Sequence, residues 1–334
     1  MSQNVGVVRV WLWTIAALIF LMVIVGGATR LTDSGLSITE WKPLLGAIPP
    51  LNQADWFAAF ARYQQIPEYQ LQNQGMSLDA FKFIYWWEWA HRFLGRIIGL
   101  VFIVPLIFFV VTGRIARPLW LRLFLLFVLG GLQGALGWYM VASGLVERTD
   151  VSQYRLAAHL TLAVALYGAV VYTAITLNKP AEVHRGRGVF WAAIFVGLLF
   201  LQVAAGGFVA GLDAGHASYT WPKMNGALLP DGLSSLQPIW KNVFENALTV
   251  QFNHRILAYV LLLFAAVQAI SMRSTSAFLV LVAVVGQAML GILTIVWQVP
   301  LATALLHQGG ALIVLTFALM HLSAVSRAPV PDRL

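Results

Sequence analysis

Cysteine is absent from this chain of 334 residues. A sequence without thiols has no disulfide, no thiolate metal site and no thioether-linked haem. The absence also excludes electron input through a pair of thiols.

Charged residues are scarce. They make up 10% of the chain, against 60% hydrophobic residues, whereas a soluble domain carries about a quarter charged residues. One membrane crossing needs about 20 apolar residues. Uncharged runs of at least this length lie between Arg9 and Arg30, Arg122 and Glu147, Arg155 and Lys179, Arg187 and Asp213, and Arg273 and Arg327.

The last of these runs is long enough for two crossings and is broken near residues 297–300. Two further helices are expected to begin near Trp89 and Ala247, which gives eight. Only helices and closed barrels span a bilayer, and these runs are too long and continuous for strands. We therefore expect an all-α membrane protein with eight transmembrane helices.

We also expect no cleavable targeting segment. The first apolar run ends in "VGGATR" without a small-residue cleavage site, and no Arg- and Ser-rich transit peptide precedes it. We expect the first helix to be a permanent span, in a bacterial inner membrane.

The basic residues lie between the apolar runs, so the isoelectric point near 10.0 does not indicate nucleic-acid binding. The two termini and the short loops after even-numbered helices hold only two acidic residues, Glu182 and Asp332. Positive charge gathers on the cytoplasmic side of membrane proteins, so both termini are expected there, with the long loops 30–88 and 212–246 outside. The ten basic residues of this set are Arg9, Arg114, Arg117, Arg122, Lys179, Arg185, Arg187, Arg273, Arg327 and Arg333.

The sequence that follows the first predicted helix is repeated, in part, after the fifth predicted helix. An offset of 180 residues aligns "GGATRLTDSGLSITEWKPLLGAIPP", from Gly26, with "GGFVAGLDAGHASYTWPKMNGALLP", from Gly206, at eight identical positions. Later, "HRFLGRIIGLV" from His91 matches "HRILAYVLLLF" from His254. The pattern predicts two tandem four-helix bundles, 1–180 and 181–334, related by a pseudo-twofold axis along the membrane normal. Residues 62–79 have no counterpart and are expected to form a polar insertion outside the bilayer.

Four histidines occupy equivalent places in the two halves. Each lies near the expected start of a helix that enters from the outside, so all four share one depth near the outer (periplasmic) surface. They are His91 and His159 in the first half and His254 and His307 in the second. A packing role explains one such residue more easily than four. The other three, His184, His216 and His321, fit solvated or interfacial positions.

Two histidines facing each other in a four-helix bundle suit a planar cofactor, because imidazole is a good iron ligand and bundle cores hold such groups. We expect one haem per half. Arg92 and Arg255, which follow His91 and His254, are placed to pair with propionates, or else snorkel to the interface. Copper is the alternative metal for four histidines.

The repeat breaks at one chemically important position. Glu88 lies three residues before His91, on the same helix face, and its counterpart before His254 is the neutral Gln251. The carboxylate can orient its neighbour through a hydrogen bond or move protons during a reaction. The asymmetry favours a reactive first half and a second half that serves it.

Taken together, these pieces resemble the heme A synthase family. The resemblance covers nearly the whole chain and rests on "GGATRLTDSGLSITEWKP", "IPEY", "WEWAHRFLGR", "GGLQGALGWYMVASGL", "HLTLA", "GGFVAGLDAG", "FNHR" and "LHQ". Some members carry cysteine pairs in the outer loops, so this chain is similar to the cysteine-free branch.

The resemblance implies an enzyme that oxidises a ring methyl of haem O to a formyl group by successive hydroxylations, giving haem A for cytochrome oxidase. It implies that His91 and His159 flank the substrate haem, with Glu88 as the essential carboxylate. His254 and His307 would then ligate a resident haem b. Haem O synthase and cytochrome oxidase assembly factors are the expected partners, besides the lipid bilayer. The electron donor and the oligomeric state stay open.

Two other functions remain as alternatives. A di-haem electron-transfer protein linked to quinol would place ligands on both membrane sides, whereas all four histidines are expected on one. A transporter would place polar groups near the midplane, whereas the ionisable residues here gather near the outer end.

Overall fold

The computed structural model describes residues 2–43, 45–146, 148–177 and 186–327. Within these ranges the chain is helical, and extended pairing is limited to an isolated antiparallel bridge between Met224 and Ala227. Eight helices of the described ranges are long and apolar enough to cross a membrane, which confirms the prediction of eight spans. They are α1 (Ser2–Leu31), α4 (Leu78–Val111), α5 (Arg117–Val141), α6 (Gln153–Thr176), α7 (Arg187–Gly211), α9 (Ala247–Met272), α10 (Thr275–Val296) and α11 (Leu301–Val325).

Short helices form parts of the two long loops. The first loop contains η1 (Leu45–Ala47), α2 (Gln53–Tyr63) and α3 (Pro67–Leu71). The second contains η2 (Ala214–Ala217), η3 (Ile239–Lys241) and α8 (Asn242–Glu245).

By their contacts the residues group into two compact units, 1–16 with 164–334 and 17–163. The expected domain boundary at residues 180 and 181 lies outside the described residues. The division into 1–180 and 181–334 and the pseudo-twofold axis therefore stay predictions.

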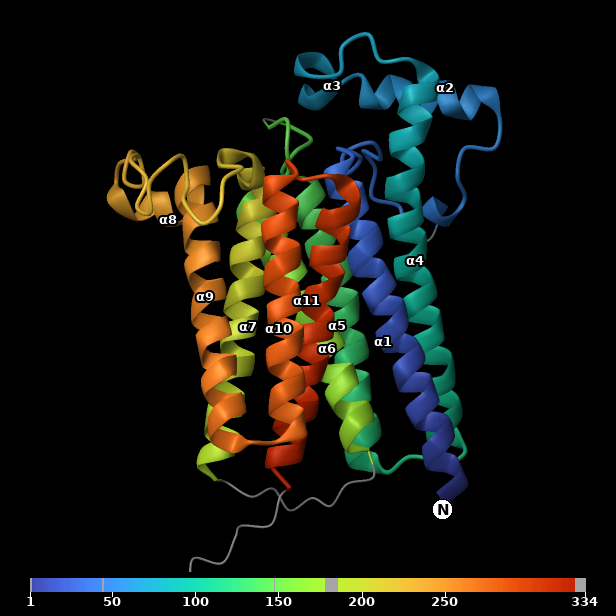
Figure 1. Cartoon of the computed structure of the whole chain (residues 1–334). Helices are drawn as coiled ribbons and strands as arrows, with labels where there is room; N and C mark the ends of the chain where they lie inside the picture. The colour runs from blue at the N-terminus through green and yellow to red at the C-terminus, as the bar shows by residue number, and fades with distance from the viewer. Residues whose placement is uncertain (1, 44, 147, 178–185, 328–334) are drawn as a thin grey trace, which may run out of the picture. The chain divides into compact units, whose positions relative to one another are not determined.

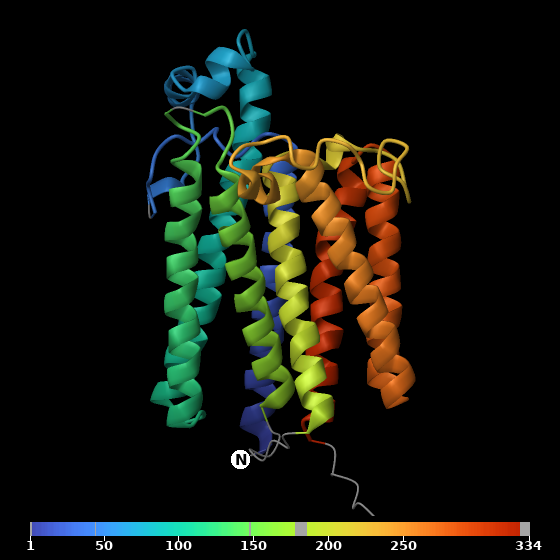
Figure 2. The ribbon, with the colours of Figure 1, turned by 90° about the vertical axis from the view of Figure 1, so that its left-hand side faces the viewer.

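Four helices of the unit that contains the C-terminal half close into a bundle. Helix α7 contacts α9 and α11, and α10 contacts the same two helices. Figures 1 and 2 show the four running side by side. Their packed faces bury apolar side chains such as Phe195 and Leu312, each 1% exposed, and this burial is the arrangement expected of a helix bundle.

Helix α4 begins well before the predicted position near Trp89. Ser77 caps it by accepting a hydrogen bond from the backbone N–H of Ala80 at 3.2 Å, and Asp79 lies in the first turn, where a negative charge favours the helix N-terminus. The prediction was wrong because it placed the start where the apolar run begins. The extra turns lie outside that run and carry aromatic residues instead.

These turns support α2 and α3, which lie at the beginning of α4 (Figure 1). Phe81 is fully buried, and its ring centroid lies 5.0 Å from that of Phe60 and 5.3 Å from that of Tyr63. The expected polar insertion therefore has an aromatic core of its own, built on the extended end of α4.

Candidate functional site

A column of three polar residues runs along α4 at four-residue spacing, so its members share one helix face. It begins with Glu88, which is 2% exposed. One carboxylate oxygen, Oε1, lies 2.6 Å from Arg92 Nη2. The other, Oε2, accepts hydrogen bonds from the Ser37 hydroxyl and the Ile38 backbone N–H, both at 2.7 Å. Glu88 therefore ties α4 to the loop that follows α1.

The two arginines of the column continue this attachment. Arg92 donates to the carbonyls of Ile38 at 2.8 Å and Glu40 at 3.0 Å. Arg96 donates to the carbonyls of residues 42 and 43, at 3.0 and 2.7 Å. Each guanidinium thus donates hydrogen bonds to loop carbonyls that have no partner in a regular helix.

Helix α9 carries the corresponding column. Gln251 Nε2 donates to the carbonyl of Ala214 at 2.8 Å, and Gln251 Oε1 accepts from Arg255 Nη2 at 3.0 Å. Arg255 also donates to the carbonyl of Thr220 at 2.8 Å. Tyr259, four residues further, accepts from an indole N–H of the loop. The second half therefore fastens its loop with a neutral amide where the first half uses a carboxylate.

The loops held by these columns start alike. Asp33 and Asp213, aligned by the repeat, both have left-handed backbone, with φ of 48° and 49°. Aspartate tolerates this conformation better than most residues, which accounts for its recurrence at the first turn of each loop.

Each of the four predicted histidines lies against a glycine of a neighbouring helix. A Cβ at Gly26 would lie 3.3 Å from the His91 ring, and a Cβ at Gly206 would lie 3.3 Å from the His254 ring. The space is tighter on the other two helices, where a Cβ at Gly137 would lie 2.8 Å from the His159 ring and a Cβ at Gly291 would lie 2.8 Å from the His307 ring. Glycine leaves the space that each imidazole fills.

Two of the four histidines, those of the second half, form a facing pair. The ring centroids of His254 and His307 are 6.4 Å apart and the rings are inclined at 77°. His91 lies within electrostatic range of His159, and His159 Nδ1 is buried without a hydrogen-bond partner among the described residues. Groups of three or more histidine and acidic side chains suited to a bare metal ion are not found in the described ranges.

Glutamines accompany three of the four histidines. Gln133 Nε2 donates to the backbone carbonyl of His159 at 2.8 Å. Gln287 Nε2 donates to the carbonyl of His307 at 2.7 Å and also lies 3.1 Å from its ring Nδ1. Gln202 contacts the carbonyl of His254 and both of its ring nitrogens, at 3.1 to 3.2 Å.

Sequence reasoning gave these glutamines no role, and it did not place the glycines against the histidines. The signal was present in the sequence, because Gln133, Gln202 and Gln287 each precede by four residues the glycine that contacts a histidine. This spacing places both residues on one helix face.

The remaining histidines lie apart from the pairs. His216 Nδ1 is 2.8 Å from the Tyr219 hydroxyl in the second long loop. His321 is 1% exposed and its Nδ1 is 2.9 Å from the Ser276 hydroxyl. His184 lies outside the described residues.

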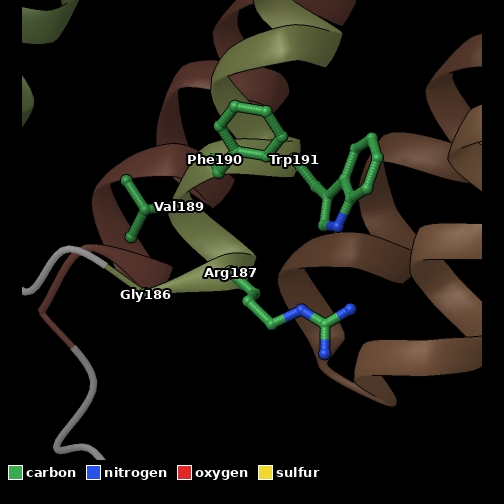
Figure 3. A pocket seen from close by; sticks show the side chains of 5 residues that line it. All are labelled: Gly186, Arg187, Val189, Phe190 and Trp191. Atoms are coloured by element: carbon green, nitrogen blue, oxygen red, sulfur yellow. The ribbon is translucent and has the colours of Figure 1, made fainter.

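A pocket of about 480 Å³ lies at the beginning of α7, lined by residues 186, 187 and 189–191. Figure 3 shows Phe190 and Trp191 beside Arg187 there. Gly206 and its histidine contact lie near the opposite end of the same helix, so this pocket is separate from the histidine site.

A second buried carboxyl lies in the first long loop. Glu68, on α3, is 3% exposed, and its Oε2 has no hydrogen-bond partner within the described part of the chain. Burial first, and then the negative charges of Asp33, Glu88 and Asp150, raise the pKa of Glu68 to about 8, while Arg30 opposes the shift. Glu68 is therefore largely protonated at neutral pH.

The fold and the site define a class: a polytopic membrane protein whose bundled helices present paired histidines beside loops fastened by buried polar side chains. The model of the family described as "Cytochrome oxidase assembly protein" (COX15-CtaA) matches residues 9–319. The chain belongs to this family.

Relatives match almost from end to end. A heme A synthase of Azorhizobium caulinodans is 54% identical over 98% of this chain and 97% of its own. Another, of Parvibaculum lavamentivorans, is 54% identical over 95% of this chain and 94% of its own. A third, of Bradyrhizobium diazoefficiens, is 50% identical over 96% and 92%.

Proposed function

We propose that this chain is a heme A synthase, an oxidoreductase that converts haem O to haem A by oxidising a ring methyl group to a formyl group. The observation that carries the proposal is a chemical difference between the two histidine pairs. Both pairs have the same glycine contacts, but only the first has a buried carboxylate, Glu88, three residues from a histidine. The full-length identity to proteins named heme A synthase supports the same conclusion.

The second pair suits a resident haem b. Two imidazoles can hold one metal ion between them when their rings face each other closely, with each ligating nitrogen about 2 Å from the metal. The 6.4 Å between the rings of His254 and His307 supports ligation of this kind. His254 and His307 would hold the iron of such a haem. A haem held there supplies a one-electron carrier.

The first pair, His91 and His159, would hold the substrate haem O. Glu88 is fixed on the same face of α4 as His91, and its two oxygens are hydrogen-bonded by the loop and by Arg92. A proton taken up on Oε1 or Oε2 would displace one of these contacts. Glu88 can therefore couple proton movement to the position of the loop, besides bracing it.

The arginines of the two polar columns hold the loops through hydrogen bonds. Arg92 and Arg255 donate to loop carbonyls, and Arg255 Nε is buried without a partner among the described residues. Pairing with propionates remains part of the proposal, through donors such as Arg255 Nε that the loop leaves free.

The chain is a multi-pass membrane protein. We place both termini in the cytoplasm and the histidine pairs near the periplasmic side of a bacterial inner membrane. The proposal includes haem O synthase and cytochrome oxidase assembly factors as partners, and leaves the electron donor and self-association open.

The test is haem extraction and chromatography of purified Glu88→Gln protein beside wild type, both produced with a supply of haem O. Wild type should contain haem b together with haem A or its hydroxylated precursor. The variant should keep haem b and accumulate unreacted haem O. Asp79→Asn is the matched control, because Asp79 lies on the same helix with a side chain 91% exposed, and it should behave as wild type.

Two results would contradict the proposal. Normal haem A formation by Glu88→Gln would leave Glu88 as a brace only. Recovery of haem b alone from every preparation would favour a di-haem electron-transfer protein.

A further inference from the structure

The four helices that supply a glycine to a histidine share a second position. Four residues before the glycine, α5, α7 and α10 carry glutamine, namely Gln133, Gln202 and Gln287. Helix α1 departs from this pattern, with Met22 four residues before Gly26. The offset of 180 residues that aligns Gly26 with Gly206 pairs Met22 with Gln202. The two proposed haem sites therefore differ at this position as well as at Glu88.

In the second half the glutamine reaches the histidine directly. Gln202 Nε2 lies 3.2 Å from both ring nitrogens of His254 and 3.1 Å from its backbone carbonyl. Gln202 Oε1 is buried without a hydrogen-bond partner among the described residues. One carboxamide therefore restrains both the ring and the backbone of His254, and retains an unused acceptor beside them.

In the first half the equivalent side chain lacks this capacity. A thioether is a weak acceptor and has no N–H to donate. The Met22 methyl lies 3.4 Å from where a Cβ on Gly95 would be, one helical turn beyond His91. It fills space against α4, and the described residues provide no hydrogen bond to the His91 ring.

We propose that Gln202 is a positioning residue that fixes His254 as a permanent haem ligand, and that Met22 leaves His91 free to bind and release haem. This inference rests on the proposed function and deepens it. A resident haem must stay bound, whereas a substrate must enter and its product must leave. An amide at residue 202 suits the haem that stays bound, and a thioether at residue 22 suits the haem that is exchanged.

The chemistry of a ligating imidazole gives the reason. When one ring nitrogen binds iron, the other carries a hydrogen, and a partner that accepts this N–H orients the ring and raises its basicity. Gln202 Nε2 faces the ring and Oε1 of the same carboxamide is unused, so a half-turn of the carboxamide would present Oε1 as that acceptor. Its loss should weaken the iron–histidine bond and stabilise ferrous over ferric iron.

The test is a reciprocal exchange in the full-length protein, Gln202→Met and Met22→Gln. Outer-sphere partners of a metal-bound histidine typically change metal affinity by about 10-fold or more. Gln202→Met should therefore transfer its haem b to apomyoglobin about 10-fold faster than wild type, with a raised midpoint potential. Met22→Gln should retain haem O and haem A through purification, with haem b unchanged.

Two further variants separate positioning from packing. Leu201→Met introduces the same side chain at the adjacent position, where the native residue is 56% exposed, and should leave both readouts unchanged. Gln202→Glu keeps an acceptor and should restore slow haem release, with a midpoint potential at or below that of wild type. A change of potential in Gln202→Met that Gln202→Glu reverses identifies the hydrogen bond as the cause.

An unchanged release rate and potential in Gln202→Met would overturn the inference while leaving the proposed function intact. A His254→Ala protein that still holds haem b would instead show that the second half is not the resident site. The proposed division of the two halves would then fail, and this inference with it.

Discussion

Glu88 and Arg92 lie one turn apart on α4, and Glu88 Oε1 is 2.6 Å from Arg92 Nη2. The Glu88 side chain is 3% exposed and the Arg92 side chain 20%. At the equivalent positions of α9, Gln251 Oε1 lies 3.0 Å from Arg255 Nη2. Both halves therefore retain the pairing of a side-chain oxygen with a guanidinium, but only the first makes it an ion pair.

The ion pair leads to a first prediction about stability. Arg92→Met removes the cation and leaves Glu88 charged and buried, which costs about 3 kcal/mol in comparable pairs. We expect a lowered thermal midpoint in detergent, measured by the unfolding of the purified protein. Because Arg92 also holds the loop carbonyls of Ile38 and Glu40, protease sensitivity of this loop should rise as well.

A double-mutant cycle distinguishes the pair from its separate contacts. Glu88→Gln with Arg92→Met should destabilise less than the sum of the single changes, since the second substitution no longer leaves a buried charge. Strict additivity would mean that the two side chains act independently, contrary to the contact seen here.

A second prediction concerns the glycines beside the histidines. In Gly291→Ala the new Cβ would be 2.8 Å from the His307 ring, and in Gly137→Ala it would be 2.8 Å from the His159 ring. Since contacts this short force the ring to move, Gly291→Ala should lose haem b. Gly137→Ala should keep haem b and convert less haem O. Absorption spectra and haem chromatography measure both effects.

Gly130→Ala provides the comparison for these variants, because a Cβ at Gly130 has nothing within 4 Å. It should match wild type. Equal loss of haem b from Gly137→Ala and Gly291→Ala would show that the two histidine pairs do not serve separate haems.

A third prediction follows from the raised pKa of Glu68. Its pKa rises from 4.5 to about 8 on folding, so the folded protein binds more protons between these values. The contribution of Glu68 to stability is full below pH 4.5 and is lost as the pH rises through 8. The thermal midpoint of wild type should therefore fall between about pH 6 and pH 9.

Glu68→Gln mimics the protonated carboxyl and should remove most of this fall, with the largest gain in stability at the alkaline end. Asp79→Asn, on the exposed side of α4, should leave the pH profile unchanged. A profile for Glu68→Gln that parallels wild type would show that other groups dominate the pH dependence.

A fourth prediction concerns the isoprenoid tail of haem O. The glycine-rich stretch of α5 leaves open space at Gly130, Gly131 and Gly134, where a Cβ would meet nothing within 4 Å. If the tail leaves the first half along this face, Gly134→Leu should lower conversion of haem O several-fold while haem b content and thermal stability stay unchanged. Small residues at such positions commonly allow close approach of another group.

Gly286→Leu is the control on α10, where a Cβ also meets nothing within 4 Å. It should not alter conversion. Full activity of Gly134→Leu, measured by chromatography of haem O and haem A, would place the tail elsewhere.

Local patterns were sufficient to predict the eight apolar helices, and they named the residues proposed for the candidate site. Uncharged runs predicted eight spans, because the cost of charge in lipid is read directly from composition. The repeat singled out His91, His159, His254 and His307, and the structure brings His254 and His307 together as a facing pair. The start of α4 was misplaced, since Ser77 and the aromatic cluster under α2 lie outside the apolar run.

Contacts made by long polar side chains could not be predicted from local sequence patterns. Arg92 donates to loop carbonyls more than 50 positions away in the chain, and its place after His91 in the sequence did not indicate these contacts. The Gln-x-x-x-Gly pattern was visible, but nothing in the sequence showed that the glutamines reach the histidines. A side chain with several rotatable bonds can reach many positions, so its hydrogen-bond partner depends on which groups the folded chain places near it.

The sequence by itself determined the class of this protein: eight apolar helices, two halves related by a repeat, and histidines at matching positions with a carboxylate in one half only. These features depend on residue type and spacing. Only the tertiary structure decided that Glu88 and Gln251 fasten loops, and that Gln202 holds His254 where Met22 cannot hold His91. Hydrogen bonds require atoms about 3 Å apart with suitable directions, and packing between helices distant in sequence sets those positions.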